Sequence, residues 1–170
     1  LINLKSGNLL IDGNKISDSN VDLWQKKISH IPQQSGFLDS SILENITFEK
    51  NFTNVDQERL KFVTKLSEIY EFIIKSPNGF QTLVGDKAIR LSGGERQRIA
   101  LSRALYNNKE VLFLDESTNA LNNEIEEKIF TNIFLEKYQK TIIAISHNEN
   151  LAKYFNVILK VKNKKVEIIK

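Results

Sequence analysis

The chain has 170 residues, of which 41% are apolar and 26% charged, and its formal net charge is +3. This composition is typical of one globular domain, excludes a disordered chain, and gives no argument for a polyanionic partner. The chain has no cysteine, which excludes a disulfide framework and thiol chemistry. No apolar run approaches the roughly 18 residues of a membrane span, and no signal peptide is visible. Because the chain also lacks methionine, we expect Leu1 to follow further residues of a longer protein.

The first elements expected in chain order are short. Residues 9–16 predict a β-hairpin that turns at Asp12-Gly13. Asn20 or Ser19 is then expected to cap a short helix that runs to Lys27. Residues 27–31 predict a strand that ends at Pro32, because proline cannot continue a strand's hydrogen-bond ladder. Gln33 follows directly, at the exit of this strand.

Between residues 54 and 75, apolar side chains recur at spacings of three and four, which predicts a helix. These side chains are Leu60, Val63, Leu66, Ile69 and Ile73. Residues 76–79, Ser-Pro-Asn-Gly, predict the turn that ends it.

A second helix is expected to begin within the stretch LSGGERQR, residues 91–98. Ser92 is a favourable N-cap, and Glu95 stands where the capping box requires a glutamate. Gly93 and Gly94 do not fit a helix start, since each costs roughly 1 kcal/mol against alanine in a helix interior. Backbone N–H groups at a helix N-terminus bind anions, so the glycines indicate either a phosphate contact or a flexible lead-in.

Two apolar runs in the last third end in polar side chains. Residues 111–116 end in Asp115 and Glu116, and the run that begins at Thr141 ends in Ser146 and His147. Residues 125–133 predict a helix between them, and 157–169 a closing hairpin. The alternation of strands and helices along the chain favours an α/β fold with buried parallel strands. Ligands bind beyond the carboxyl ends of such strands, so Asp115, Glu116 and His147 are expected to meet there.

These stretches resemble the nucleotide-binding domain of ATP-binding-cassette (ABC) proteins. LSGGERQR resembles the family signature, VLFLDE the Walker B strand, ISH the switch-histidine loop, and IPQQSGFLDSSILENITF the Q-loop. The resemblance implies a P-loop NTPase-like α/β fold with a mostly parallel sheet, flanking helices and peripheral antiparallel hairpins. It implies a partial domain over residues 1–170, with a compact helical subdomain at about 36–105.

The resemblance also implies ATP and Mg²⁺ as cofactors and a role for each matching residue. Asp115 would hold Mg²⁺ through water, Gln33 would contact Mg²⁺ and the attacking water, and Glu116 would act on that water as a base. His147 would contact the γ-phosphate. The signature would contact the nucleotide of a second, two-fold-related domain through Ser92, Gly93, Gly94 and Glu95.

The sequence departs from the family pattern in several places. Glu95 replaces the usual glutamine of the signature, and Asn122 stands where an aspartate is usual, in the loop after Walker B. Thr82–Asp86 is similar to a segment of exporter-type members, with Asp86 and Ala88 in place of Glu and Gly. The phosphate-binding motif G-x-x-x-x-G-K-[ST] does not occur in these residues, so we expect them not to bind ATP tightly by themselves.

The function favoured is that of an exporter-type ATPase domain, which drives export or flipping of a substrate across a membrane. Its expected partners are a second nucleotide-binding domain and a transmembrane domain fused upstream, with no nucleic acid. Its expected location is the cytoplasmic face of a plasma or inner membrane. An importer ATPase subunit, a non-transport ABC protein and a hydrolytically inactive module remain as alternatives.

Overall fold

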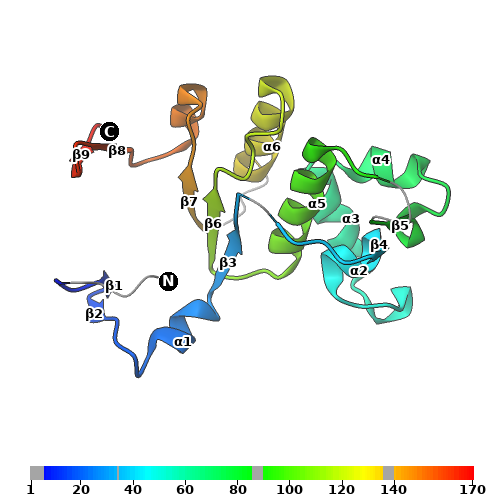
Figure 1. The fold of residues 1–170 in the computed structure, drawn as a ribbon, viewed down its shortest axis with the longest axis horizontal. Helices are drawn as coiled ribbons and strands as arrows, with labels where there is room; N and C mark the ends of the chain where they lie inside the picture. The colour runs from blue at the N-terminus through cyan, green and yellow to red at the C-terminus, as the bar shows by residue number, and fades with distance from the viewer. Residues whose placement is uncertain (1–5, 34, 86–89, 136–139) are drawn as a thin grey trace.

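The computed structural model describes residues 6–33, 35–85, 90–135 and 140–170. Its centre is a parallel sheet in the order β3 (Ile28–Ile31), β6 (Val111–Asp115) and β7 (Thr141–Ile145). In register, Ile28 pairs with Val111, and Val111 with Thr141, so β6 and β7 end side by side (Figure 1). The α/β sheet expected from the sequence is confirmed, and it aligns the ends of the strands that precede Glu116 and His147.

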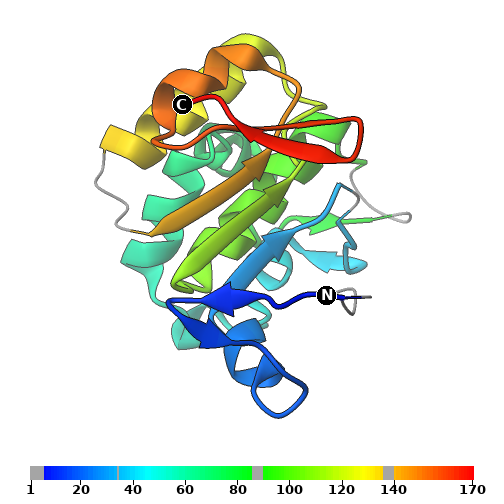
Figure 2. The same cartoon turned by 90° about the vertical axis from the view of Figure 1, so that its left-hand side faces the viewer.

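Helices cover one face of this sheet (Figure 2). They are α5 (Gly93–Tyr106) and α6 (Asn123–Leu135), which pack on the buried side chains Ile31, Leu112 and Leu114. Among the described residues the opposite face is open, since Ile143 and Ile145 of β7 are 45% and 46% exposed. The expectation of strands buried on both faces therefore fails for this part of the chain.

A helical region lies on the other side of α5. It contains α2 (Ile42–Thr47), α3 (Gln57–Leu66) and α4 (Tyr70–Lys75), the short 3₁₀ turns η1 (Phe52–Asn54) and η2 (Gly79–Gln81), and the antiparallel pair β4 (Ser40–Ser41) and β5 (Leu83–Val84). Its own apolar cluster includes Ile42, Ile46, Leu60 and Ile73. Ile99 of α5 belongs to this cluster, together with Leu91 just before the helix, whereas Leu101 and Leu105 of α5 belong to the cluster under the sheet. Helix α5 is thus the element that joins the two cores.

The single helix expected over 54–75 is divided in two. Helix α3 ends at Leu66, and Glu68 adopts a left-handed φ of 56° before α4 begins at Tyr70. The apolar spacing still identified the buried side chains correctly, because all five are buried. The apolar period continues across the break, although Leu60, Ile69 and Ile73 belong to the cluster of the helical region and Val63 and Leu66 to the cluster under the sheet.

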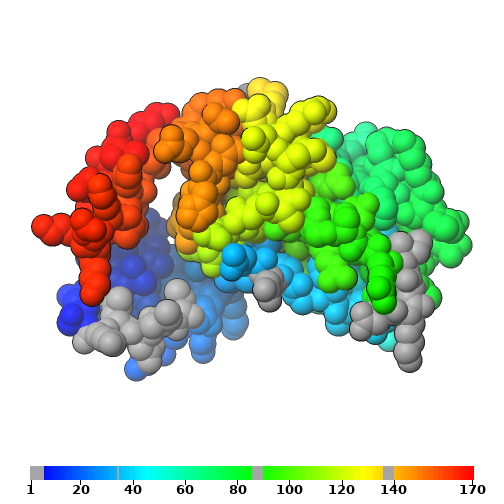
Figure 3. All heavy atoms as spheres, turned by 45° about the horizontal axis from the view of Figure 1, so that its top comes forward, coloured from blue at the N-terminus to red at the C-terminus, as the bar shows by residue number. Residues whose placement is uncertain are grey.

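Both expected hairpins are present: β1 (Leu10–Ile11) with β2 (Asn14–Lys15), and β8 (Leu159–Lys162) with β9 (Lys165–Ile168). Asn163 and Lys164 have φ values of 51° and 60°, as a two-residue turn with right-handed strand twist requires. Much of the C-terminal hairpin's apolar surface is exposed, and it stands apart from the sheet beside an opening (Figure 3).

Two local expectations need correction. Helix α1 (Val21–Gln25) ends before Lys27, and Asn20 occupies its N-cap without capping it. Instead, the Asn20 amide accepts a hydrogen bond from the Ser17 N–H and donates one to the Lys15 carbonyl, which ties the helix to the first hairpin.

The segment after β7 forms the 3₁₀ helix η3 (Glu149–Tyr154). None of the helices in the described part of the chain has the length and apolar content needed to cross a lipid bilayer. Asp86 and Ala88 lie outside the described residues.

Candidate functional site

The backbone at the end of β6 takes an unusual course at Glu116. Its φ is 47°, a left-handed conformation that costs a non-glycine residue of order 1–3 kcal/mol. The Glu116 N–H donates to the carbonyl of Ile145, 3.1 Å away at the end of β7. The turn after β6 is therefore anchored to the neighbouring strand, which fixes where the Glu116 side chain starts.

Three side chains from separate segments converge on the Glu116 carboxylate. Gln33, from the loop after β3, donates from Nε2 to Oε2 at 3.0 Å, and Asn119 donates from Nδ2 to the same oxygen at 3.0 Å. His147, from the loop after β7, places Nε2 2.9 Å from Oε1. An ionised carboxylate only accepts hydrogen bonds, so that nitrogen of His147 carries the proton.

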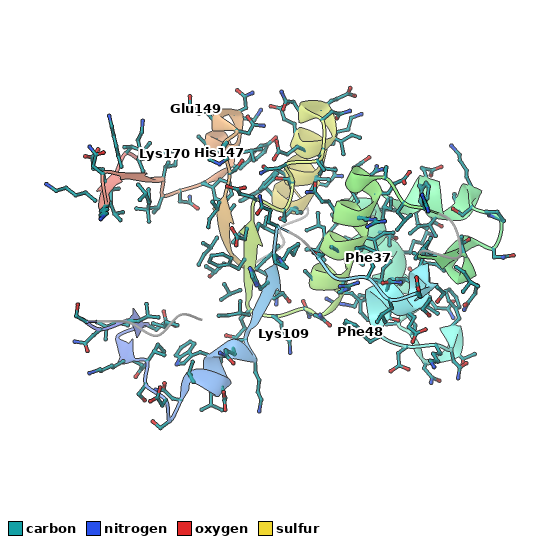
Figure 4. The ribbon with its side chains drawn as sticks, viewed as in Figure 1. Phe37, Phe48, Lys109, His147, Glu149 and Lys170 are labelled. Carbon is teal, nitrogen blue, oxygen red and sulfur yellow. The ribbon has the colours of Figure 1, made fainter. Side chains whose placement is uncertain are left out.

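The site is open to solvent on its His147 side. The His147 side chain is 83% exposed, whereas that of Glu116 is only 25% exposed. Figure 4 shows His147 in the connection between β7 and η3. The structure thus brings together Gln33, Glu116 and His147, which the sequence placed at three strand exits.

Asp115 is the last residue of β6 and lies beside a second histidine. Nε2 of His30, on β3, is 3.9 Å from Oδ2 of Asp115, and both side chains are about half exposed, at 50% and 43%. The ring of His30 also makes an edge contact with Phe113, at 5.5 Å between centroids. No motif in the sequence singles out His30, which lies on β3 between the buried Ser29 and Ile31.

Residues 92–95 form the expected helix start. The Ser92 hydroxyl accepts from the Glu95 N–H at 3.3 Å, and Glu95 Oε2 accepts from the Ser92 N–H at 2.7 Å, which completes a capping box. Among the described residues, no hydrogen bond joins Ser92, Gly93, Gly94 or Glu95 to the cluster around Glu116. The two groups of site residues that the sequence predicted are therefore not joined by a direct hydrogen bond among the described residues.

The two glycines of this helix start lie against the loop at residues 117–122. A Cβ at Gly93 would stand 3.3 Å from the Cβ of Ala120, and one at Gly94 would stand 3.4 Å from the Ala120 carbonyl oxygen. Close packing within the chain therefore favours glycine at both positions, in addition to the phosphate contact that the sequence suggested.

The same loop carries two asparagines with defined contacts. Asn119 holds Glu116, as described above, and the backbone N–H of Asn119 donates to the Glu116 carbonyl at 3.3 Å. Asn122 Oδ1 accepts from the Ile125 N–H at 2.8 Å and so caps the start of α6. The unusual Asn122 thus has a structural role in this chain.

Arg103 links the segment after Gln33 to α5. Its guanidinium donates to the carbonyl of Gly36 and to the carbonyl and side chain of Asn45. Its Cζ lies 5.2 Å from the ring centroid of Phe37 and 5.4 Å from that of Phe48, the two rings labelled in Figure 4. Burial lowers the pKa of Arg103 below the ordinary value of an arginine. Arg98 has a pKa lowered for the same reason, an effect opposed by Glu95 and Glu68.

The polar side chains gathered at the carboxyl ends of parallel strands define an α/β ligand-binding protein. Comparison with known sequences makes this class specific: the family described as "ABC transporter" matches residues 1–119, and the chain belongs to it. Membership in this family makes it a nucleotide-binding domain, or a part of one.

The relatives are exporters. The multidrug resistance protein pgp-1 of Caenorhabditis elegans is 35% identical over 157 residues, which are 92% of this chain and 12% of that protein. The ATP-dependent lipid A-core flippase of Saccharophagus degradans is 34% identical over 162 residues, 95% of this chain and 27% of the flippase. A solved structure of a bacterial Atm1-family ABC exporter with ATP bound matches with a TM-score of 0.84 and 28% identity, over 96% of this chain and 28% of that one.

These matches favour an exporter-type domain over an importer ATPase. The chain spans only 12% to 28% of the length of these three relatives.

Proposed function

We propose that this chain is the part of an ABC exporter's ATPase domain that carries the hydrolytic carboxylate, and that ATP hydrolysis at this site drives a substrate across a membrane. The observation that carries the proposal is the convergence of Gln33, Asn119 and His147 on Glu116. Phosphoryl transfer to water needs a positioned group that orients or deprotonates the attacking water, together with donors that stabilise phosphate charge. A carboxylate surrounded by an amide and an imidazole can supply both.

In the proposed reaction, Glu116 accepts a proton from the attacking water, and His147 donates a hydrogen bond to the γ-phosphate. The present contacts occupy both oxygens of the Glu116 carboxylate. Oε2 accepts from both Gln33 and Asn119, whereas Oε1 accepts only from His147. Since each carboxylate oxygen has two lone pairs, we infer that the attacking water approaches Oε1.

The side-chain oxygen atoms near Glu116 are suitable ligands for a magnesium ion. Mg²⁺ in phosphoryl-transfer sites is held by one or two carboxylates, waters and the substrate phosphates, so it needs no cage of several acids. Asp115 would supply the carboxylate, and Gln33 would supply its amide oxygen, which makes no hydrogen bond to the described residues. When bound, Mg²⁺ neutralises charge on the phosphate oxygens.

The signature residues are proposed to act on a second domain's nucleotide. Ser92 and Glu95 satisfy each other in the capping box, which leaves the helix-start N–H groups around Gly93 and Gly94 to face an anion. No hydrogen bond of the described residues joins Ser92, Gly93, Gly94 or Glu95 to Glu116, so we propose a two-domain arrangement in which each site is completed by its partner. The subdomain at about 36–105 and the domain over 1–170 remain our proposals for the division of the chain.

The relatives' names and lengths support the remaining parts of the proposal. One relative is named for multidrug resistance and another as a lipid A-core flippase, so we propose a lipid or a small hydrophobic compound as the substrate. The transmembrane domain would be fused upstream of Leu1, and the ATPase domain would lie on the cytoplasmic face of a plasma or inner membrane. Nucleic acid has no part in this proposal.

The test compares the full-length protein with its Glu116→Gln variant, with Glu110→Gln as the control. Glu110 is exposed and pairs with Lys27 at the opposite end of β6. The proposal predicts that Glu116→Gln binds Mg-ATP with nearly unchanged affinity and loses at least about 100-fold in turnover, since a general base contributes about that much. Equal turnover in the wild type and Glu116→Gln would refute it.

A further inference from the structure

Glu126 is a buried acid that the proposed reaction does not use. It lies in the first turn of α6, and only 4% of its surface is exposed. It makes no ion pair with any lysine, arginine or histidine of the described residues. A buried carboxylate without a cation is costly unless hydrogen bonds satisfy both of its oxygens.

Each oxygen of Glu126 accepts one hydrogen bond, and the two donors come from different loops. Thr118 donates from its hydroxyl to Oε1 at 2.6 Å, and Asn148 donates from Nδ2 to Oε2 at 2.5 Å. Thr118 lies two residues after Glu116, and Asn148 follows His147 directly. Glu126 therefore bridges the loops that carry the two chemical groups of the site.

Helix capping alone does not explain this residue. An acid in the first turn of a helix is favourable when it is exposed, and Glu124 already supplies one, paired with Lys128 at 2.8 Å. Asn148 is itself held in place, because its N–H donates to the Ser146 hydroxyl and its Oδ1 accepts from the Asn150 N–H. With one amide atom used inside its loop, Asn148 presents a fixed donor to Glu126.

We infer that Glu126 is a positioning residue, which sets the 2.9 Å separation of Glu116 and His147 by tying their two loops to the start of α6. This inference rests on the proposed function of that pair. Loss of the bridge frees two loops at once, and the reacting groups then sample geometries in which they do not meet. The proposed bond from His147 to the γ-phosphate matters most in the transition state, so turnover falls more than nucleotide affinity.

The experiment measures ATPase activity against Mg-ATP concentration in the full-length protein, for Glu126→Ala, Glu126→Gln and the control Glu127→Ala. Glu127 is the next residue of α6 and makes a surface pair with Lys153. Glu126→Ala is expected to lower kcat by about 10- to 100-fold, the usual effect of losing a supporting hydrogen bond in an active site, with KM changed less than about threefold. Glu127→Ala is expected to leave both constants unchanged.

Glu126→Gln provides the rescue. The glutamine oxygen can accept from Asn148, and its amide can donate to the Thr118 hydroxyl, which is able to accept. We expect kcat within about threefold of the wild type for this variant, because both bridging bonds persist in neutral form. Equal kcat in Glu126→Ala and the wild type, or an effect confined to KM, would overturn the inference.

If Glu126→Ala fails to fold, Thr118→Val and Asn148→Ala still test whether Glu126 positions the two loops. Each of these variants removes only one of the two hydrogen bonds to Glu126. If Glu126 transmits between the loops, these two variants lower kcat separately, and their effects combine non-additively. Independent effects, or none, overturn the inference. Failure of the proposed function is read separately: it would appear as normal turnover in Glu116→Gln, whatever the Glu126 variants do.

Discussion

The side-chain oxygen of Gln97 accepts a hydrogen bond from the backbone N–H of Ala120 at 2.9 Å. Gln97 lies in the first turns of α5, after the capping box, and Ala120 lies in the loop that follows Glu116. This contact joins the helix start, proposed to face a partner's nucleotide, to the loop beside the chain's own hydrolytic group. Each half of the proposed dimer thus has a short physical link between the two sites.

Removal of this link should weaken both stability and activity. Gln97→Ala loses one hydrogen bond and leaves the Ala120 N–H to water, so we expect about 1 kcal/mol of destabilisation. Turnover of the full-length protein should fall several-fold, because the loop carrying Asn119 moves more freely. The control is Gln25→Ala, on the exposed face of α1. An unchanged melting temperature and unchanged kcat would contradict this role.

The contact between Gly93 and Ala120 predicts a compensating pair of substitutions. Gly93→Ala removes the backbone freedom of glycine, which stabilises when the new Cβ fits, but here that Cβ meets Ala120 at 3.3 Å. We expect Gly93→Ala to raise the melting temperature in an Ala120→Gly background and to fail to do so in the wild type. Thermal unfolding of the four proteins of this cycle measures the coupling. Equal shifts in the two backgrounds would show that the contact is unimportant.

Asn122 should be replaceable by the aspartate that is usual in the family. Asp is as good an N-cap as Asn, and its charge is favourable at the start of α6. We therefore expect Asn122→Asp to keep or slightly raise stability, while Asn122→Ala loses about 1 kcal/mol with the bond to the Ile125 N–H. Chemical denaturation distinguishes the two variants. If both lose the same stability, the cap is not what Asn122 contributes.

Arg103 is expected to be irreplaceable by lysine. Its guanidinium satisfies carbonyl groups of two segments and stacks on two aromatic rings, which needs a planar group with several donors. Arg103→Lys should destabilise by about 1–3 kcal/mol, because the carbonyl and side-chain oxygens of the buried Asn45 lose their guanidinium donors. Denaturant titration checks this, with the exposed Lys61→Arg as a control. A neutral Arg103→Lys would show that charge alone suffices at this position.

The parts of the fold that sequence predicted well are those set by neighbouring residues. Ser92 and Glu95 form a capping box because the pattern contains all that the box requires, and Asn163-Lys164 forms its turn. The ends of β6 and β7 were also predictable, because the change from an apolar run to acids or to a histidine marks where each buried strand ends. Glu116 and His147 could be brought together on this basis alone.

The parts that sequence missed depend on long-range geometry. Gln33 and Glu116 are 83 residues apart, and their meeting was expected from family resemblance and not from spacing. No motif singled out Asn119 or Glu126, because the left-handed backbone at Glu116 and the 22-residue separation of Glu126 from Asn148 leave no local pattern. The break at Glu68 was missed for the opposite reason: the apolar period continues across it.

The central claim is that Glu116 carries out the chemical step, and a single-turnover experiment tests it most directly. Full-length wild type and Glu116→Gln are each mixed, in excess, with radiolabelled Mg-ATP, and the bound nucleotide is recovered and separated. We predict that the wild type yields ADP and that Glu116→Gln retains intact ATP over many wild-type turnover times. Recovery of ADP from Glu116→Gln at the wild-type rate would show that another group performs the hydrolysis.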